Sequence, residues 1–373
     1  MVKKILVTGA TGFVGKNLVV ELRNRKYSTI YEYDLDSEPN LLDQYTKDCD
    51  FVFHLAGVNR PKEEREFMTG NFGFTSDLLA SLKKNNNKAP LLITSSIQAA
   101  FDNPYGRSKK AGEDLIFEYA NETGTLVYVY RLPNVFGKWC RPNYNSAVAT
   151  FCHNLANGFP ITINDPEVVM NLVYIDDVVN ELIRQIESGK QPISENKYCS
   201  VSPIHTIQLG DIATLISSFR DSRLNLSIPL MTDAFTKKLY STYLSYLPVD
   251  QFSYPLKMNI DSRGSFTEFL KSSDRGQVSV NISKPGIAKG NHWHHTKCEK
   301  FLVVSGCGVI RFRKVNSDKI LEYFISGEKL EVVDIPVGYT HNIENLGANV
   351  MVTIMWANES FDPDKPDTYF ETV

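Results

Sequence analysis

Tyr105 and Lys109 lie four positions apart in a segment with helical spacing. Because four residues make about one helical turn, both side chains are expected on one helix face. A nearby ammonium favours the phenolate, which predicts that Lys109 lowers the pKa of Tyr105 from its ordinary value of about 10. A tyrosine tuned in this way can exchange a proton with a sugar or alcohol oxygen while hydride moves at the adjoining carbon. The run Thr94-Ser95-Ser96, at the end of a predicted strand, precedes the pair and argues against a chance spacing.

A glycine-rich turn follows the first predicted strand and opens a predicted helix. Glycines at positions 9, 12 and 15 allow a tight turn, close approach of the backbone to a pyrophosphate, and close packing of the helix on the strand. The helix N-terminus adds free N–H groups and a partial positive charge. Strand, loop and helix in this order predict a dinucleotide site. Its expected cofactor-binding residues are Gly9, Thr11, Gly12, Phe13, Val14 and Gly15.

Asp34 ends the second predicted strand, at the distance beyond the glycine turn where a carboxylate can bond the ribose 2′-hydroxyl of NAD. A 2′-phosphate would meet like charge at this position, so Asp34 favours NAD over NADP. An ordinary turn aspartate is the alternative interpretation, because Asp36 follows two residues later.

Four residues in the last third of the chain have the types and spacing of a metal site. His292 and His294 alternate along a predicted strand and therefore share one face. Glu299 on the next strand and the distant His341 would complete a set of three nitrogens and one oxygen. A histidine-rich surface loop is the alternative, but it does not explain the positions of Glu299 and His341. Zinc is placed ahead of iron, manganese and nickel, since imidazole serves all of them.

The hydrophobic pattern divides the chain into two parts. The first alternates continuous apolar runs with helical segments, which predicts a Rossmann-type, doubly wound parallel α/β sheet over 1–247. The second, 248–373, has short strands punctuated by Gly, Pro, Asn and Asp, which predicts an all-β sandwich or barrel. Expected strands of the first part are 3–8, 29–33, 50–55, 90–95 and 126–131, and helices 17–23, 70–84, 108–121, 175–188 and 209–220. Expected strands of the second part are 266–270, 277–282, 301–304, 309–313, 319–325, 331–335 and 350–356.

Composition excludes several classes of protein. The 373 residues carry 40 Lys and Arg against 43 Asp and Glu, a net charge of −3, with no basic footprint for nucleic acid. The longest apolar runs fall far short of the roughly 20 residues that a bilayer span needs. The start of the chain is interpreted as a buried strand and not a signal peptide. Six scattered cysteines without a C-x-x-C pair indicate reduced thiols in a cytoplasmic protein.

The motifs of the first part, taken together, resemble extended short-chain dehydrogenases/reductases that act on nucleotide sugars. They run in the order of that family from position 3 to about 179. They are T-G-x-x-G-x-x-G, His54-Leu55-Ala56-Gly57, Asn71-x-x-x-Thr75, Ser95-Ser96, Tyr105-x-x-x-Lys109, Arg131-x-x-Asn134-Val135-Phe136-Gly137 and Val173-Tyr174-Ile175-Asp176-Asp177-Val178.

This resemblance implies roles for individual residues. Tyr105 would donate the proton, and Lys109 would hold the nicotinamide ribose. Ser96 would bond the reacting oxygen, with Ser95 as the alternative. Leu55, Ala56 and Gly57 would join the cofactor site, Asn134 would contact substrate, and Asn71, Thr75 and Asp177 would brace the fold. The 4,6-dehydratases of the family carry an Asp-Glu pair after the Ser/Thr, but this chain has Ser96-Ile97-Gln98. Reduction or C4 epimerisation is therefore favoured over dehydration.

The histidine pattern of the second part resembles the two cupin motifs, which implies a jelly-roll domain. Asp261-x-Arg263-Gly264-x-Phe266-x-Glu268 resembles the opening of deoxysugar-nucleotide 3,5-epimerases, which are also cupins. A metal near a 4-keto group would acidify the adjacent carbon while a base moves its proton. His295 and Lys289 are candidate bases, with a solvated role as the alternative for each. Arg263 is expected either to meet a sugar-nucleotide phosphate or to form an ion pair that stabilises the fold.

Taken whole, the chain is similar to the CapF family of bacterial capsular polysaccharide enzymes. The resemblance implies C3 epimerisation of a UDP-4-keto-6-deoxy-HexNAc in the cupin domain, then C4 reduction in the first domain to UDP-2-acetamido-2,6-dideoxy-L-talose, on the way to UDP-N-acetyl-L-fucosamine. It also implies NADPH and a homodimer, whereas Asp34 favours NADH, and no arginine follows it to receive a 2′-phosphate. The alternatives are a UDP-sugar 4-epimerase with tightly bound NAD and a cupin that only binds or dimerises, and a non-catalytic sensor. A sensor has no need of the Tyr105–Lys109 pair.

Overall fold

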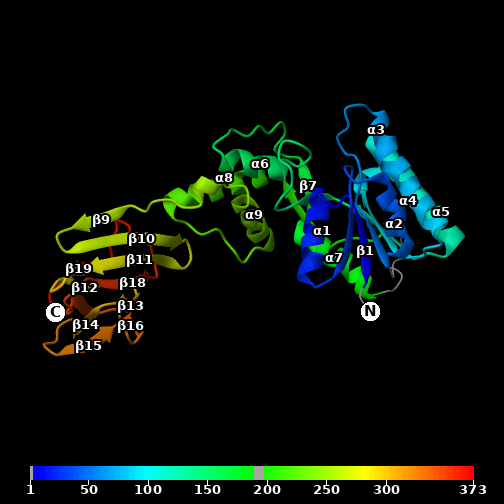
Figure 1. The fold of residues 1–373 in the computed structure, drawn as a ribbon. Helices are drawn as coiled ribbons and strands as arrows, with labels where there is room; N and C mark the ends of the chain where they lie inside the picture. The colour runs from blue at the N-terminus through cyan, green and yellow to red at the C-terminus, as the bar shows by residue number, and fades with distance from the viewer. Residues whose placement is uncertain (1–2, 189–196) are drawn as a thin grey trace. The chain divides into compact units, whose positions relative to one another are not determined.

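The computed structural model of the protein describes residues 3–188 and 197–373 (Figure 1). They form two compact units, one of Met1–Ser217 with Ala234–Pro248 and the other of Ser218–Asp233 with Val249–Val373. The first is an α/β unit and the second is all-β apart from its leading segment. This confirms the predicted fold class. No helix within the described residues is long and apolar enough to cross a bilayer.

A five-stranded parallel sheet forms the centre of the first unit, in the order β2-β1-β3-β4-β5. Its central strands form because their apolar runs are buried on both faces, as the run Ile5, Leu6 and Val7 in β1 shows. Neighbouring residues point to opposite layers, so Ile5 and Val7 enter one core and Leu6 the other. The strands are β1 (Lys4–Thr8), β2 (Thr29–Tyr33), β3 (Phe51–His54), β4 (Leu91–Ser96) and β5 (Val127–Leu132).

Helices cover both faces of this sheet. Apolar residues of α1 (Phe13–Asn24) and α7 (Ile175–Ser188) fill one core, and those of α2 (Pro39–Asp48), α4 (Phe74–Lys84) and α5 (Pro104–Thr123) fill the other. The short α3 (Arg65–Phe67) leads through a π-helical turn, Met68–Gly73, into α4. Helix α5 begins at Pro104 because the Asn103 side chain caps it by accepting from the N–H of Gly106 at 2.8 Å. This cap sets the position of Tyr105 in the first turn.

Smaller elements follow the main sheet. A three-stranded sheet has the order β6 (Asn134–Phe136), β7 (Val169–Tyr174) and β8 (His205–Gln208). The helices here are α6 (Ala147–Ala156), α8 (Leu209–Asn225) and α9 (Ala234–Leu244). Helix α6 starts where the Ser146 hydroxyl accepts from the N–H of Ala149 at 3.2 Å.

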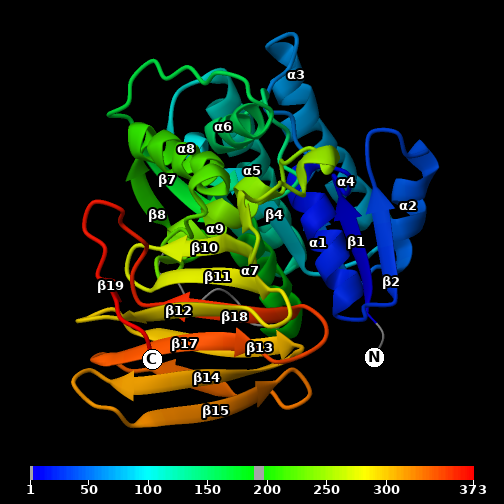
Figure 2. The same ribbon diagram turned by 90° about the vertical axis from the view of Figure 1, so that its left-hand side faces the viewer.

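Two antiparallel sheets form the second unit (Figure 2). Their orders are β16-β13-β18-β11-β10-β9 and β15-β14-β17-β12-β19. Phe301 and Met351 of one sheet and Phe312 and Ile343 of the other share one core, as expected for a jelly roll. The strands are β9 (Met258–Asp261), β10 (Gly264–Ser272), β11 (Gly276–Ser283), β12 (Ala288–Trp293), β13 (Glu299–Ser305), β14 (Cys307–Lys314), β15 (Ile320–Ser326), β16 (Val332–Ile335), β17 (Tyr339–Asn345), β18 (Met351–Ala357) and β19 (Tyr369–Phe370).

Candidate functional site

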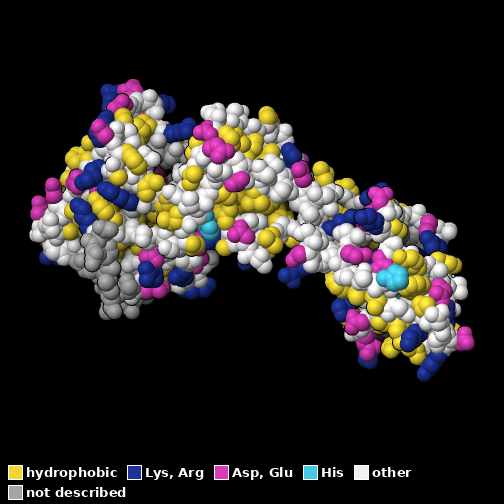
Figure 3. Space-filling model, turned by 180° about the vertical axis from the view of Figure 1, so that it is seen from behind, with side chains coloured by type: hydrophobic (Ala, Val, Ile, Leu, Met, Phe, Trp, Pro, Cys, Tyr) yellow, Lys and Arg dark blue, Asp and Glu magenta, His cyan; other side chains and the backbone are white. Residues whose placement is uncertain are grey.

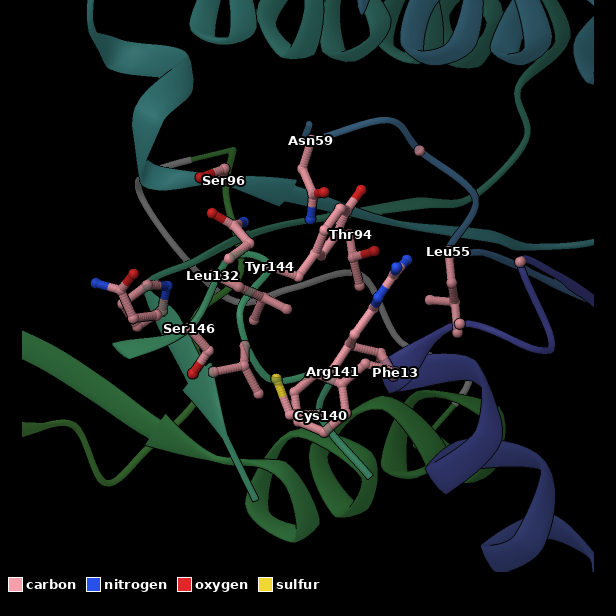
Figure 4. A pocket seen from close by; sticks show the side chains of 18 of the residues that line it. Phe13, Leu55, Asn59, Thr94, Ser96, Leu132, Cys140, Arg141, Tyr144 and Ser146 are labelled. Atoms are coloured by element: carbon pink, nitrogen blue, oxygen red, sulfur yellow. The ribbon is translucent and has the colours of Figure 1, made fainter. Parts of the chain in front are cut away.

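A cavity of about 750 Å³ lies at the carboxyl ends of the parallel strands of the first unit (Figure 4). The glycine turn after β1, Leu55 and Gly57 after β3, Ser96 at the end of β4 and Leu132 at the end of β5 all line it. This is where doubly wound sheets bind their ligands. Of the predicted site residues, Gly9, Thr11, Gly12, Phe13, Val14, Gly15, Leu55, Gly57, Ser96, Tyr105, Lys109 and Asn134 line the cavity, whereas Asp34 and Ala56 do not.

The glycine turn is held by its own backbone. Gly9 has a φ of 71°, and an added Cβ would lie only 2.6 Å from the backbone nitrogen of Ala56. Its N–H donates to the carbonyl oxygen of Tyr33 at 2.8 Å, and the N–H of Gly12 donates back to the Gly9 carbonyl oxygen at 3.1 Å. These two bonds and the close approach of Gly9 to Ala56 fix the conformation of the turn.

The Asp34 side chain accepts hydrogen bonds from Thr11 of this turn. Its carboxylate accepts from the N–H of Thr11 at 2.7 Å and from the Thr11 hydroxyl at 2.6 Å, while its other oxygen accepts from the N–H of Leu35 at 2.8 Å. Burial opposes ionisation, but the bonds from Thr11 outweigh it and the pKa of Asp34 falls below its ordinary value. The charge of Asp34 thus stabilises the turn, and its contact with a ribose stays a prediction.

Tyr105 and Lys109 occupy successive turns of α5, as the spacing predicts, but their protonation differs from the expectation. Burial raises the pKa of Tyr105, and a hydrogen bond with the Ser96 side chain lowers it only in part. Burial lowers the pKa of Lys109 to about 8, while Glu113 opposes this shift. The predicted lowering of the tyrosine pKa is wrong for the protein without ligands, because both groups are desolvated and the ammonium lies 6.0 Å from the ring centroid.

Gly57 permits the close approach of Lys109 to β3. A Cβ at Gly57 would lie 2.8 Å from both the Lys109 Nζ and the Asn71 Oδ1. Asn71 is itself fixed, since its side chain accepts from the N–H of Val58 and donates to the Val58 carbonyl oxygen, each at 2.9 Å. A methyl group at position 57 would therefore displace the Lys109 ammonium or the Asn71 amide from its present place.

Ser95 and Ser96 have different partners. The Ser95 hydroxyl donates to the carboxylate of Glu113 at 2.6 Å, inside the fold. Glu113 has a fully buried side chain and accepts a bidentate pair from Arg131, at 2.9 Å from Nε and 2.6 Å from Nη2. Both serines line the cavity, but the Ser96 hydroxyl oxygen accepts from the N–H of Gln98, at 3.1 Å, and its own proton is not committed to Glu113. This difference favours Ser96 over Ser95 as the residue that meets a reacting oxygen.

The second unit brings His292, His294, Glu299 and His341 together, with ligand atoms within 4.8 Å of one another. His292 and His341 pair across β12 and β17, next to a bulge at Asn291, whose φ of 62° re-aims the strand. His294 lies just beyond β12, and Glu299 begins β13 in the other sheet. The cluster therefore spans both sheets of the jelly roll.

The atoms of this cluster fit a divalent cation. The Glu299 Oε2 lies 3.4 Å from the His294 Nε2 and 3.3 Å from the His341 Nε2. Two ligands of a tetrahedral zinc lie about 3.4 Å apart when each is about 2.1 Å from it. The His294 Nε2, Glu299 Oε2 and His341 Nδ1 are buried without a hydrogen-bond partner. Burial lowers the pKa of His292 to about 4, so its imidazole is neutral, as a ligand must be.

Comparisons with known proteins cover the whole chain. Residues 5–198 match the NAD dependent epimerase/dehydratase family, and residues 259–369 match the polysaccharide biosynthesis C-terminal domain. The chain is 46% identical over 366 residues to UDP-2-acetamido-2,6-beta-L-arabino-hexul-4-ose reductase of Pseudomonas aeruginosa, covering 98% of each. The crystal structure of the capsular polysaccharide assembling protein CapF from Staphylococcus aureus is 56% identical, with a TM-score of 0.93 over 99% of this chain and 100% of that one. This chain belongs to the CapF family.

The NAD-bound UDP-glucuronic acid 4-epimerase of Bacillus cereus shares the fold of the first unit. Its TM-score is 0.54 at 20% identity, over 65% of this CapF-family chain and 98% of that chain. The match of residues 5–198 to the NAD dependent epimerase/dehydratase family supports a nicotinamide cofactor for this unit.

The CapF-family chain also has cavity residues that the sequence reasoning missed, in the loop between β6 and α6. Trp139, Cys140, Arg141 and Tyr144 line the cavity, and the Arg141 guanidinium lies 5.0 Å from the Tyr144 ring centroid. Figure 4 shows Arg141 among the lining side chains. These residues belong to the run 138–145 of the sequence, but the spacing within this run does not predict a catalytic or binding role.

Lys16, Lys109 and Arg141 give this cavity a positive charge. No Asp or Glu belongs to the described lining. Elsewhere the charges are mixed, and on the face in Figure 3 acidic and basic side chains alternate over each unit. A cation-lined cavity beside a glycine turn suits ligands that carry phosphates.

The two candidate bases, Lys289 and His295, and the predicted phosphate contact Arg263 have distinct environments. Lys289 donates to the Asn281 Oδ1 at 2.8 Å and to the Ile282 carbonyl oxygen at 2.9 Å, which leaves little freedom for proton transfer. His295 is exposed and packs against Trp293, with ring centroids 4.6 Å apart. Arg263 makes a two-nitrogen ion pair with Asp261 at 2.9 and 2.6 Å. Both side chains of this pair are exposed, and the contact of Arg263 with a sugar-nucleotide phosphate stays a prediction.

Proposed function

We propose that the protein is a bifunctional nucleotide-sugar enzyme of capsular polysaccharide synthesis. The second unit would epimerise C3 of a UDP-4-keto-6-deoxy-HexNAc, and the first would reduce the C4 ketone to give UDP-2-acetamido-2,6-dideoxy-L-talose. The observation that carries the proposal is one cavity that is lined by Ser96, Tyr105 and Lys109 beside a glycine turn. The name of the Pseudomonas aeruginosa relative, a 4-ulose reductase, supports the reductive direction.

The proton for the reduction comes from Tyr105. Because burial raises its pKa, the phenol is protonated at neutral pH, which is the form that can donate to a C4 oxygen. Ser96 would donate a second hydrogen bond to the same oxygen and hold the carbonyl in place. A bound reduced nicotinamide supplies the hydride to C4, so ketone, hydride and proton together give the alcohol. Lys109 would bond the nicotinamide ribose.

NADPH is the proposed reductant, with NADH as the alternative. The family resemblance supports NADPH, whereas the negative charge of Asp34 disfavours a 2′-phosphate beside it. Initial rates with each reductant at matched concentrations decide between them.

The sugar nucleotide would lie in the same cavity, with its phosphates near Arg141 and Lys16. Ser146, Ala147 and Val148 place the start of α6 in the cavity lining, where free N–H groups favour an anion. Asn134 also lines the cavity and stays the predicted sugar contact.

The second unit would hold zinc through His292, His294, Glu299 and His341. A bound zinc would polarise the 4-keto group and so acidify C3. Of the predicted bases, the bonds of Lys289 argue against it, and His295 remains the candidate. A homodimer is proposed from the family resemblance.

NMR of the product formed from the UDP-4-keto-6-deoxy-HexNAc in deuterated buffer tests both steps. We expect one deuterium at C3 and one NAD(P)H oxidised for each sugar reduced. A Tyr105→Phe variant should lose reduction by ~10²–10⁴-fold and keep C3 exchange. A His341→Ala variant should lose bound metal and C3 exchange and still reduce pre-epimerised sugar. Interconversion at C4 without net NAD(P)H consumption would instead identify a 4-epimerase, with the cupin as a binding or dimerisation domain.

A further inference from the structure

The last described segment of the chain folds over the histidine cluster. Strand β19 pairs with β12, so that Phe370 lies opposite His292 and Tyr369 opposite Trp293. Beyond it, Arg313 donates to the Glu371 carboxylate at 2.6 Å. These bonds bring residue 367 beside the predicted ligand His294.

Asp367 contacts the ligand strand through both its side chain and its backbone. Its Oδ1 accepts from the N–H of His295 at 2.9 Å, and its Oδ2 accepts from the N–H of Thr296 at 2.7 Å and of Lys297 at 2.9 Å. The Thr296 hydroxyl donates to the same Oδ2 at 3.1 Å. The carbonyl oxygen of Asp367 meets the Nδ1 of His294. One residue therefore bonds the ligand ring and the three residues that follow it.

The backbone contact decides the tautomer of His294. A carbonyl oxygen can only accept, so the Nδ1 must carry the proton and donate it. In the neutral ring, which a metal ligand must be, the Nε2 then has the lone pair, and this is the atom that lies buried without a hydrogen-bond partner, 3.4 Å from the Glu299 Oε2. A lone pair directed into a cluster with a carboxylate and two more imidazoles is ready to bind a cation.

We infer that Asp367 is a positioning residue for the metal: its carboxylate anchors the chain after β12, and its carbonyl oxygen holds His294 in the Nδ1–H tautomer with Nε2 directed at the ion. This inference rests on the proposed metal site. It assigns a metal-tuning role to a residue 73 positions beyond the ligand that it orients. Loss of such partners lowers metal affinity by ~10–100-fold in other sites.

The test compares three full-length variants. Asp367→Ala removes all four side-chain bonds and frees the segment that carries the carbonyl oxygen. Asp367→Asn keeps the size and one oxygen acceptor. Asp364→Ala is the matched control, since it removes one negative charge from an exposed residue of the same segment. Zinc affinity is measured by competition with a chromophoric chelator, and ligand geometry by the visible absorption of the cobalt-substituted protein.

We expect Asp367→Ala to bind zinc ~10–100-fold more weakly and to shift the cobalt bands, because a rotated imidazole changes the ligand field. Asp367→Asn should fall between Ala and wild type, and Asp364→Ala should match wild type. Wild-type affinity and spectrum in Asp367→Ala would overturn the inference. If Asp367→Ala does not fold, a wild-type spectrum and affinity in Asp367→Asn would overturn it instead. A wild-type chain that takes up no zinc would refute the proposed metal site itself.

Discussion

Replacement of Glu113 by glutamine tests how the fold supports the reductase site. The side chain of Glu113 is fully buried, and its carboxylate accepts two bonds from Arg131 and one from Ser95. Glutamine keeps the shape but removes the charge and presents an N–H₂ group to a donor. Breaking a buried pair by removing one partner costs ~3–5 kcal/mol. We take the lower end, about 3 kcal/mol, because the Arg131 side chain is 21% exposed and still stacks 3.8 Å from the Tyr198 ring centroid.

Hydrogen-exchange mass spectrometry of peptides from β4, β5 and α5 measures this loss. About 3 kcal/mol corresponds to roughly 100-fold faster exchange for amides that exchange by opening of this region. The Glu118→Gln variant is the control, since it makes the same change at an exposed position of the same helix. If Glu113→Gln exchanges no faster than Glu118→Gln, the buried pair does not stabilise the sheet edge and the reasoning is wrong. Adding Arg131→Met should restore part of the protection, because it removes the charge left without its partner.

Three further predictions concern the two sites. Gly57→Ala should displace the Lys109 Nζ by about 0.6 Å, from 2.8 Å to an ordinary contact of 3.4 Å, and lower kcat/KM for reduction by roughly 10-fold or more in initial-rate assays. The reduction rate should fall as pH rises through about 8, where Lys109 loses its proton. The contribution of Lys109 to the free energy of unfolding should rise from about pH 8 to 10.5, because in this range the unfolded chain binds more protons than the folded one. Removing the metal with a chelator should lower the Tm of the second unit, as measured by calorimetry. The lost stability should be ~4 kcal/mol when the free metal concentration before chelation was 1,000 times its Kd. An unchanged Tm after metal loss would contradict the last of these.

The sequence predicted those helices and strands whose hydrophobic pattern matches their burial in the fold. The apolar runs of β1 to β5 and the helical spacing of α7 agree closely with the structure. Strands β12 and β17 lack the apolar run that marks a core strand, because β12 has only partly buried or exposed residues and the buried residues of β17 are mostly polar. The cluster of His292, His294, Glu299 and His341 was nevertheless predicted from strand alternation and the cupin spacing, and its role as a metal site stays a prediction.

Other features depend on contacts that spacing does not encode. The tyrosine pKa was predicted in the wrong direction because burial, and not the neighbouring lysine, dominates it. Glu113 meets Arg131 across 18 positions, and Asp367 meets His294 across 73. Arg141 belongs to a loop whose course follows from tertiary bonds, including that of the Tyr246 hydroxyl to the Cys140 carbonyl oxygen at 2.5 Å.

The bonds between Asp34 and Thr11 affect any attempt to redesign coenzyme preference. Exchange of an acidic residue at this position for a neutral one is an obvious way to admit an extra phosphate. Here the exchange would also remove the two bonds that restrain Thr11 in the glycine turn, where the pyrophosphate of either coenzyme is expected to bind. Both coenzymes would then pay the entropy of ordering that turn on binding. A switch of preference at Asp34 therefore calls for a second substitution that restrains Thr11.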